Sequence, residues 1–204
     1  MRVGEVVGLS WNDIDLDKST ITIQRQARYI TAKHGHFFCP PKTDASKRTI
    51  VISPALCNAL LIWKAQQAKN ELCYGGSYIC VYSDSEGRVI KLSKKLTPPP
   101  DVQREQLVCT KENGALISVD TLRWKLRREG LNSHSFRHTH ATVLIEHGAT
   151  PKGVAARLGH ASTSITQDLY THNTKKLDED TAKIFETAVA PMQTSHSCRQ
   201  IADK

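Results

Sequence analysis

The sequence contains no long apolar run, few aromatic residues and no paired cysteine motif. Its 204 residues are 39% hydrophobic and 6% aromatic, and no stretch approaches the roughly 18 consecutive apolar residues of a membrane-spanning helix. The 6 cysteines form no C-x-x-C pair and show no zinc spacing, which favours reduced intracellular thiols. The sequence therefore predicts a globular domain with neither a membrane-spanning helix nor a disulfide framework.

The sequence also shows no convincing metal-binding motif. Among the 9 histidines, His134 and His138 have the i, i+4 spacing of a helical metal pair, but Arg137 lies beside them in the sequence. No cluster of carboxylates suits magnesium. We therefore expect no metal and no other cofactor. A metal-dependent nuclease remains an alternative, and cleavage that a chelator abolishes would favour it.

Positive charge is what the sequence has in excess. Its 28 Lys and Arg residues against 20 Asp and Glu residues give a net charge of +8, which favours a polyanionic partner. Part of this charge lies on a predicted helix from Ser118 to Arg128, in the basic run Arg123, Lys125, Arg127 and Arg128. Basic runs commonly form solvated faces, and contact with nucleic-acid phosphates is the functional alternative.

Capping residues mark two consecutive helices in the last third of the chain. The first helix begins after Asn132 and ends at Gly148, and the second begins at the cap Thr150 and ends at Gly159. The residues of the first helix expected to face the core are Phe136, His140, Val143 and Leu144. A third helix is predicted to begin near residue 162.

Four polar residues in this region suggest chemistry on a phosphate. His134 and Arg137 are three positions apart, so they project from one face of the first helix. His160 follows a glycine that ends a helix, and Tyr170 comes ten residues later. A guanidinium, two imidazoles and a phenol brought together are suited to binding and attacking a phosphate group.

The N-terminal half predicts a small sheet and one long helix. Residues 1–9 have the pattern of a helix end, with Arg2 and Glu5 three positions apart. Period-two alternation predicts a strand over 20–30, and two further strands near 37–38 and 48–52 complete one antiparallel sheet around a polar loop. A helix is expected over 54–70, with its core face formed by Leu56, Leu60, Leu61 and Trp63.

The remaining segments carry weaker signals. Strands are predicted at 78–82 and 89–92, followed by a stiff proline-rich stretch over 94–101. Helical spacing of apolar residues predicts an amphipathic helix over 175–189, and the residues from about 193 onward have the composition of a disordered tail.

Five motifs together resemble one protein family. His134-Ser-Phe-Arg137-His-Thr, Leu158-Gly159-His160 and Leu169-Tyr170-Thr-His resemble the signature of the tyrosine recombinases, the family of phage and transposon integrases. The stretch from Met1 to Asp15 resembles the first arginine box of the family. The stretch from Pro41 to Ile52 resembles its lysine-bearing β-hairpin, in which Lys42 of Pro41-Lys42-Thr is the best match to the lysine. The motifs occur in family order and lie within residues 1–55 and 107–190.

This resemblance implies a fold and a domain organisation. It implies a catalytic domain over 1–190 that is α+β and mainly helical, with a small antiparallel three-stranded sheet near the N-terminus. Residues 74–106 depart from the family, and we interpret them as an insertion, a solvent-side elaboration. A core-binding domain precedes this domain in the family, so we expect the chain to be the C-terminal part of a longer protein. Residues 191–204 would form a disordered tail.

The resemblance also implies a role for each site residue. Tyr170 would attack the DNA phosphate as the nucleophile and form a 3′-phosphotyrosine. Arg2 and Arg137 would bind the phosphate, and His160 would donate a hydrogen bond to a phosphate oxygen. His134 would accept the tyrosine proton and Lys42 would protonate the departing 5′ oxygen, with Lys47 as the fallback for Lys42. Glu5 would support Arg2 from beside the site, and His138 would support Arg137.

The implied partner is double-stranded DNA, without ATP or an obligatory metal. Self-association into a tetramer on DNA, through the helix over 175–189, follows from the same resemblance, as does action in the cytoplasm of a bacterium. One alternative from a different class remains open. Residues 150–170 also have the pattern of a helix-turn-helix with a glycine in the turn, which would bind DNA without catalysis.

Overall fold

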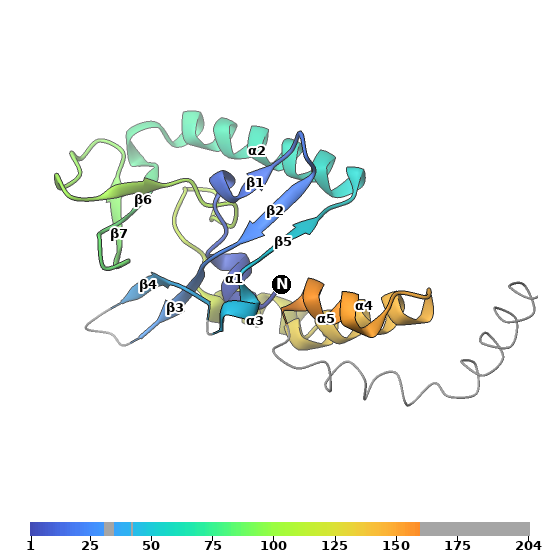
Figure 1. Cartoon of the computed structure of the whole chain (residues 1–204). Coiled ribbons are helices and arrows are strands. Elements are labelled where there is room, and N and C mark those ends of the chain that lie inside the picture. Colours follow the sequence, from blue (N-terminus) through green and yellow to red (C-terminus); the bar gives the residue numbers. More distant parts are fainter. Residues whose placement is uncertain (31–34, 42, 160–204) are drawn as a thin grey trace, which may run out of the picture.

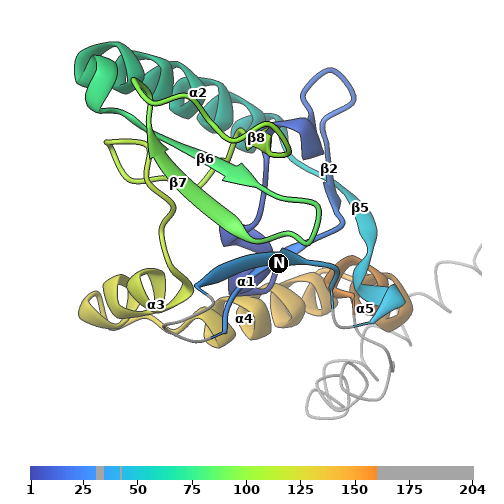
Figure 2. The same ribbon diagram turned by 90° about the vertical axis from the view of Figure 1, so that its left-hand side faces the viewer.

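The computed structural model describes residues 1–30, 35–41 and 43–159. Within them, three small antiparallel sheets lie between a long helix, α2, and a group of helices that includes α4 and α5 (Figures 1 and 2). The predicted α+β class and the small antiparallel three-stranded sheet near the N-terminus are confirmed, but this sheet takes its strands from 14–15, 20–23 and 48–51, and two further sheets accompany it. The predicted tail over 191–204 and the helix over 175–189 lie outside the described residues.

The first sheet packs against α2 (Pro54–Tyr74). It has the order β1-β2-β5, with strands at Ile14–Asp15, Thr20–Ile23 and Arg48–Val51. Ile21 and Ile23 are buried between this sheet and the helix, in a cluster that includes Cys57. The Ser53 side chain accepts a hydrogen bond from the backbone N of Leu56 and so caps α2.

The predicted core face of α2 is only partly correct. Leu60 and Trp63 pack against the cluster, but Leu56 and Leu61 are 43% and 50% exposed. Gln67 is buried on this side of the helix instead. Its side-chain amide accepts a hydrogen bond from the indole N of Trp11 at 2.8 Å and donates one to the Leu107 carbonyl at 3.2 Å. No helix in the described part of the chain is long and apolar enough to cross a membrane.

The predicted strand over 20–30 is wrong because the chain breaks it at Gln24 and Arg25. The Gln24 amide donates to Asp13, and Arg25 donates to the Gly8 carbonyl at 2.9 Å and pairs with Glu105 at 2.8 Å. These side-chain contacts hold the two residues in place outside any strand pairing. The chain then pairs again as a separate two-stranded sheet, β3 (Gln26–Tyr29) with β4 (His36–Cys39).

The interpretation of residues 74–106 as a solvent-side elaboration is wrong for 78–83, which contribute to the core. Cys80 and Val81 are 4% and 3% exposed, and Val81 packs with Phe38 and Leu107. The backbone N of Phe38 also donates to the Gly87 carbonyl at 2.8 Å. These residues form the third sheet, of order β7-β6-β8, from β6 (Ile79–Ser83), β7 (Val89–Ser93) and β8 (Gln103–Glu105).

The short helix α1 (Val3–Val7) is fixed by close contact with β3. Val7 is 0% exposed and packs with Ala27 of that strand. A Cβ atom at Gly8 would lie 2.8 Å from the backbone N of Ala27, so only glycine permits this approach. The helix α3 (Val119–Arg128), capped by Ser118, packs its Leu122 on the same core. The position of Arg2, at the start of α1, is thereby set by the sheet behind it.

Helices α4 (Ser133–Glu146) and α5 (Pro151–Leu158) form a hairpin with the predicted caps. Asn132 accepts from the backbone N of His134 at 3.0 Å, and Thr150 accepts from that of Gly153 at 3.2 Å. Gly159 ends α5 in the left-handed conformation, with φ 69° and ψ 47°.

The predicted core face of α4 is mostly wrong. Phe136 and Val143 are 50% and 45% exposed, and His140 is also exposed. Leu144 does pack against the hairpin core, which is formed by Ala141, Ile145, Val154 and Leu158. The buried stripe of α4 is therefore rotated from the predicted one, because α5 packs against the side of Ala141.

Candidate active site

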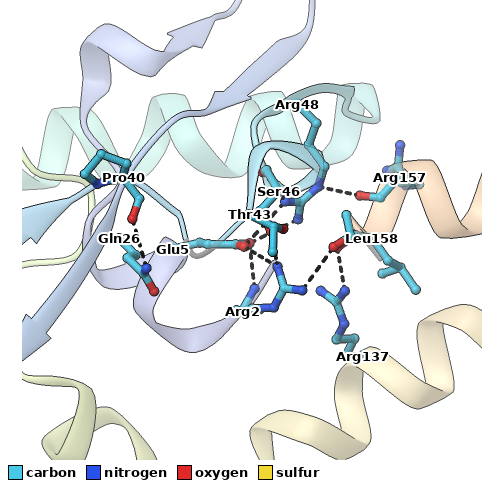
Figure 3. A network of polar contacts seen from close by, with 11 residues as sticks. Arg2, Glu5, Gln26, Pro40, Thr43, Ser46, Arg48, Arg137, Arg157 and Leu158 are labelled. Carbon is cyan, nitrogen blue, oxygen red and sulfur yellow. Dashed lines mark hydrogen bonds and ion pairs between the residues drawn. The ribbon is translucent and has the colours of Figure 1, made fainter. Parts of the chain in front are cut away.

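The carboxylate of Glu5 is the centre of a buried polar network (Figure 3). The Glu5 residue is 2% exposed, and its two oxygens accept four hydrogen bonds. The backbone N and Nη1 of Arg2 donate to it at 2.8 and 3.0 Å. Nη1 and Nη2 of Arg48 donate at 3.4 and 3.0 Å. This predicted supporting residue therefore joins two arginines that are distant in sequence.

Ser46 joins the same network from the loop before β5. Its Oγ accepts from Nη1 of Arg2 at 2.9 Å, and its carbonyl accepts from Nη1 of Arg48 at 2.8 Å. The Ser46 and Thr43 hydroxyls share a further hydrogen bond of 2.9 Å. Ser46 is 1% exposed and ends the short 3-10 helix η2 (Asp44–Ser46). The residues on either side of the predicted lysine hairpin tip are thus anchored to Arg2.

Three arginines from three segments meet the last carbonyls of α5. Nε of Arg48 donates to the Arg157 carbonyl at 2.8 Å, and Nη2 of Arg2 donates to the Gly159 carbonyl at 3.0 Å. Nη2 of Arg137, on α4, donates to the Leu158 carbonyl between them. Helix C-termini leave their last carbonyls without partners and carry partial negative charge, so three cations are favourable there.

The network holds three guanidiniums against one carboxylate. Burial alone would raise the pKa of Glu5, but hydrogen bonds from Arg48 and from the Arg2 backbone outweigh it and hold the pKa below 4.5. Burial, and then repulsion from Arg2 and Arg48, lowers the pKa of Arg137 from 12.5 to about 10. Arg137 therefore stays ionised near neutral pH, and the excess of guanidiniums over carboxylates favours an anion.

A cavity of about 600 Å³ opens beside this network. Arg2 and Arg137 line it together with His134 and His138, and residues of β3 and α3 form its other walls. Both histidines are exposed on α4. The arrangement places two guanidiniums and an imidazole around one open space, which is the geometry required to bind a phosphate and move a proton beside it.

A second cavity, of about 220 Å³, lies between α3 and the N-terminus of α4. It is lined by Arg123 and Arg127 and, across from them, by His134. Arg123 also lines the larger cavity, so the two cavities adjoin and share part of their walls. Arg128 lies over the Trp124 ring, 5.0 Å from its centroid. The predicted basic run is thus divided, with Arg123 and Arg127 toward the site and Lys125 and Arg128 on other sides of the helix.

The structure brings four of the six predicted catalytic or supporting residues that it describes to one cavity. These are Arg2, His134, Arg137 and His138; Glu5 lies directly behind Arg2, and Lys47, the fallback, pairs with Asp44 at 3.7 Å on the exposed loop. Lys42, His160 and Tyr170 lie outside the described residues. Within the described ranges, no group of three or more His, Cys, Asp or Glu side chains is arranged to hold a metal ion.

Sequence reasoning missed Arg48 and Ser46. Arg48 begins a predicted strand, where an arginine is commonly solvated, yet its side chain is 7% exposed. The only local signal was the position of both residues in the stretch that resembles the lysine hairpin. Their importance depends on Glu5, 43 positions away from Arg48, and no periodicity reports such a contact.

Comparison with known proteins identifies the family of this chain. Residues 1–176 match the phage integrase family, and the chain belongs to that family. It is 30% identical over 185 residues to the "Tyrosine recombinase XerC-like" protein of Caldanaerobacter subterraneus subsp. tengcongensis, which covers 84% of this chain and 42% of that protein. It is 29% identical over 178 residues to the "ICEBs1 integrase" of Bacillus subtilis, covering 84% and 41%. The chain thus spans less than half of the length of these relatives.

Two solved structures share the fold. The Tn1549 transposon integrase in complex with transposon right end DNA matches with a TM-score of 0.65 and 20% identity, over 92% of this chain and 55% of that one. The XerA recombinase matches with a TM-score of 0.54 and 20% identity, over 89% and 52%. The chain therefore shares its fold with these two solved structures.

Proposed function

We propose that this chain is the catalytic part of a site-specific DNA recombinase that acts through a 3′-phosphotyrosine at Tyr170. The observation that carries the proposal is the convergence of Arg2 and Arg137 on one end of α5, beside a cavity that His134 also lines. Membership of the phage integrase family supports it, and the related integrase was solved bound to DNA. The substrate class is double-stranded DNA.

The proposed reaction divides between these residues. The Tyr170 oxygen attacks the phosphorus atom, the bond from phosphorus to the 5′ oxygen breaks, and the DNA 3′ end becomes joined to tyrosine. His134 accepts the phenolic proton, and Lys42 protonates the departing 5′ oxygen. Arg2, Arg137 and His160 donate to the non-bridging oxygens, where negative charge increases. Attack by a 5′ hydroxyl of another strand reverses these steps, so rejoining needs no ATP.

Binding would involve more than the cleaved phosphate. Arg123 and Arg127 line the cavity that continues from the site, so we place the neighbouring DNA phosphates along α3. Lys125 and Arg128, on other sides of that helix, would contact DNA only at a distance from the site. Assembly of four copies on DNA through residues 175–189 remains a prediction.

A nicked DNA duplex tests the proposal. It carries the end sequence of the element that encodes this chain, and the nick lets the short flank diffuse away after cleavage. The chain is incubated with it at low salt in EDTA, and a denaturing gel reports any protein–DNA adduct. We expect an adduct that Tyr170→Phe abolishes while DNA binding remains. Binding without an adduct would favour the helix-turn-helix alternative, and cleavage only without EDTA would favour a metal-dependent nuclease.

A further inference from the structure

Arg48 contacts three parts of the site at once. Its guanidinium holds both oxygens of Glu5, the Ser46 carbonyl and the Arg157 carbonyl at the end of α5. The side chain is 7% exposed and does not line the 600 Å³ cavity, so it lies behind the site rather than facing a substrate. We propose that Arg48 is a positioning residue, which fixes the guanidinium of Arg2 and the end of α5 relative to each other.

The orientation of Arg2 depends on groups that Arg48 holds. Nη1 of Arg2 donates to Glu5 and to the Ser46 hydroxyl, and Nη2 donates to the Gly159 carbonyl. Arg48 hydrogen-bonds directly to Glu5 and to the backbone of Ser46. The third partner of Arg2, the Gly159 carbonyl, is held only indirectly, because Arg48 donates to the Arg157 carbonyl two residues earlier. Arg2 itself is 43% exposed and would be mobile without these partners.

The end of α5 also connects Arg2 with Arg137. Gly159 adopts the left-handed conformation, which ends the helix there, and its carbonyl accepts from Arg2. The Leu158 carbonyl, one residue earlier, accepts from Arg137. A shift of this turn therefore moves the partners of both site arginines together, and Arg48 restrains the turn from the opposite side through Arg157.

This geometry matters because two guanidiniums must meet one phosphate. A misplacement of about 1 Å in a positioned group can slow a reaction by about 10²-fold. Lysine at position 48 keeps the charge but cannot span Glu5 and the Arg157 carbonyl with one ammonium group. The inference rests on the proposed function, so its test also needs a measurement that does not require DNA cleavage.

The first measurement follows the guanidinium of Arg2 by ¹⁵N NMR in the chain without DNA. We expect restricted rotation about its Cζ–N bonds in the wild type, and loss of that restriction in Arg48→Lys and in Ser46→Ala. Arg25→Lys is the matched control, because Arg25 is a largely buried arginine, 21% exposed, bound to Gly8 and Glu105 away from the cavity.

The second measurement is single-turnover cleavage of the nicked DNA at saturating protein, with the dissociation constant measured separately. We expect Arg48→Lys to slow cleavage by about 30- to 100-fold with little change in DNA affinity. Ser46→Ala, which removes one bond to Arg2, should slow it less. In an Arg2→Lys background, Arg48→Lys should slow cleavage by a clearly smaller factor than in the wild type, because part of its effect acts through Arg2.

The possible outcomes separate the two proposals. If Arg48→Lys slows cleavage no more than Arg25→Lys does, or adds its full effect in the Arg2→Lys background, the positioning role is overturned. If Arg48→Lys does not fold, Ser46→Ala decides by the same two measurements. If the wild type forms no adduct, the proposed function fails, and the NMR result still decides whether Arg48 fixes Arg2.

Discussion

Two groups of arginines in this protein differ in how firmly they are held. Around Glu5, the Arg48 side chain is 7% exposed, and Arg2 is fixed by a carboxylate, a hydroxyl and a carbonyl. On α3, Arg123 is 44% exposed, with a 3.5 Å ion pair to an exposed aspartate, and Arg127 is exposed. The same residue type is therefore fixed where, in the proposed function, a reacting phosphate would be oriented, and left adaptable where phosphates would only be held.

Among the substitutions that test this comparison of the two arginine groups, we expect the one at Arg137 to have the largest effect on DNA cleavage. Arg137→Lys keeps a positive charge but loses the planar fork, so cleavage of the nicked DNA should slow by about 10²- to 10³-fold with DNA affinity nearly unchanged. Single-turnover gels measure the rate. Arg157→Lys is the control, because that guanidinium binds the Val51 carbonyl and His140 instead. Equal effects of the two variants would contradict the assignment.

The next effect concerns the buried carboxylate. Glu5→Gln leaves Arg48 without its counter-charge, so the free energy of unfolding at pH 7 should fall by about 3 kcal/mol. The folded-state pKa of Glu5 lies below its unfolded value of 4.5. Its contribution is therefore fully present above pH 4.5 and is lost as the pH falls through the folded pKa. Urea unfolding from pH 7 to pH 3 should show the difference between variant and wild type shrinking below pH 4.5. A difference that does not depend on pH would argue against this electrostatic origin.

The smallest effect is expected on α3. Arg123→Gln with Arg127→Gln should weaken DNA binding and reduce the slope of log K against log salt by about 2, while the cleavage rate at saturating DNA stays within about threefold. Binding titrations at several salt concentrations measure the slope. The matched control removes two lysines from α2, Lys64→Gln with Lys69→Gln, at the other end of the molecule (Figure 1). The same slope change in both double variants would mean that only net charge matters.

Local signals predicted the helices that carry the site. Asn132 and Thr150 cap α4 and α5 as expected, and Gly159 ends α5, because a cap bonds within a few residues of itself. The shared face of His134 and Arg137 also follows from helix geometry alone. By contrast, the buried side of α4 depends on where α5 packs, which is why Phe136 and Val143 were misplaced.

The features that the sequence did not predict depend on contacts with residues far away along the chain. The break at Arg25 is stabilised by Glu105, 80 positions later, so alternation over 20–30 favoured one continuous strand. Val81 is buried because its sheet packs against Phe38, and nothing within 74–106 indicates that contact. Arg48 was missed for the same reason, since its buried partner lies 43 positions earlier.

The hydrogen bond from Arg2 to the Gly159 carbonyl has a consequence for the newly made protein. The two residues are 157 positions apart. At a synthesis rate of roughly 5–20 residues per second, Arg2 leaves the ribosome tunnel roughly 8 to 30 s before this partner is available. An unfinished chain, or one cut before α5, lacks these carbonyl partners of its arginines, so the proposed action on a phosphate would arise only in a nearly complete domain.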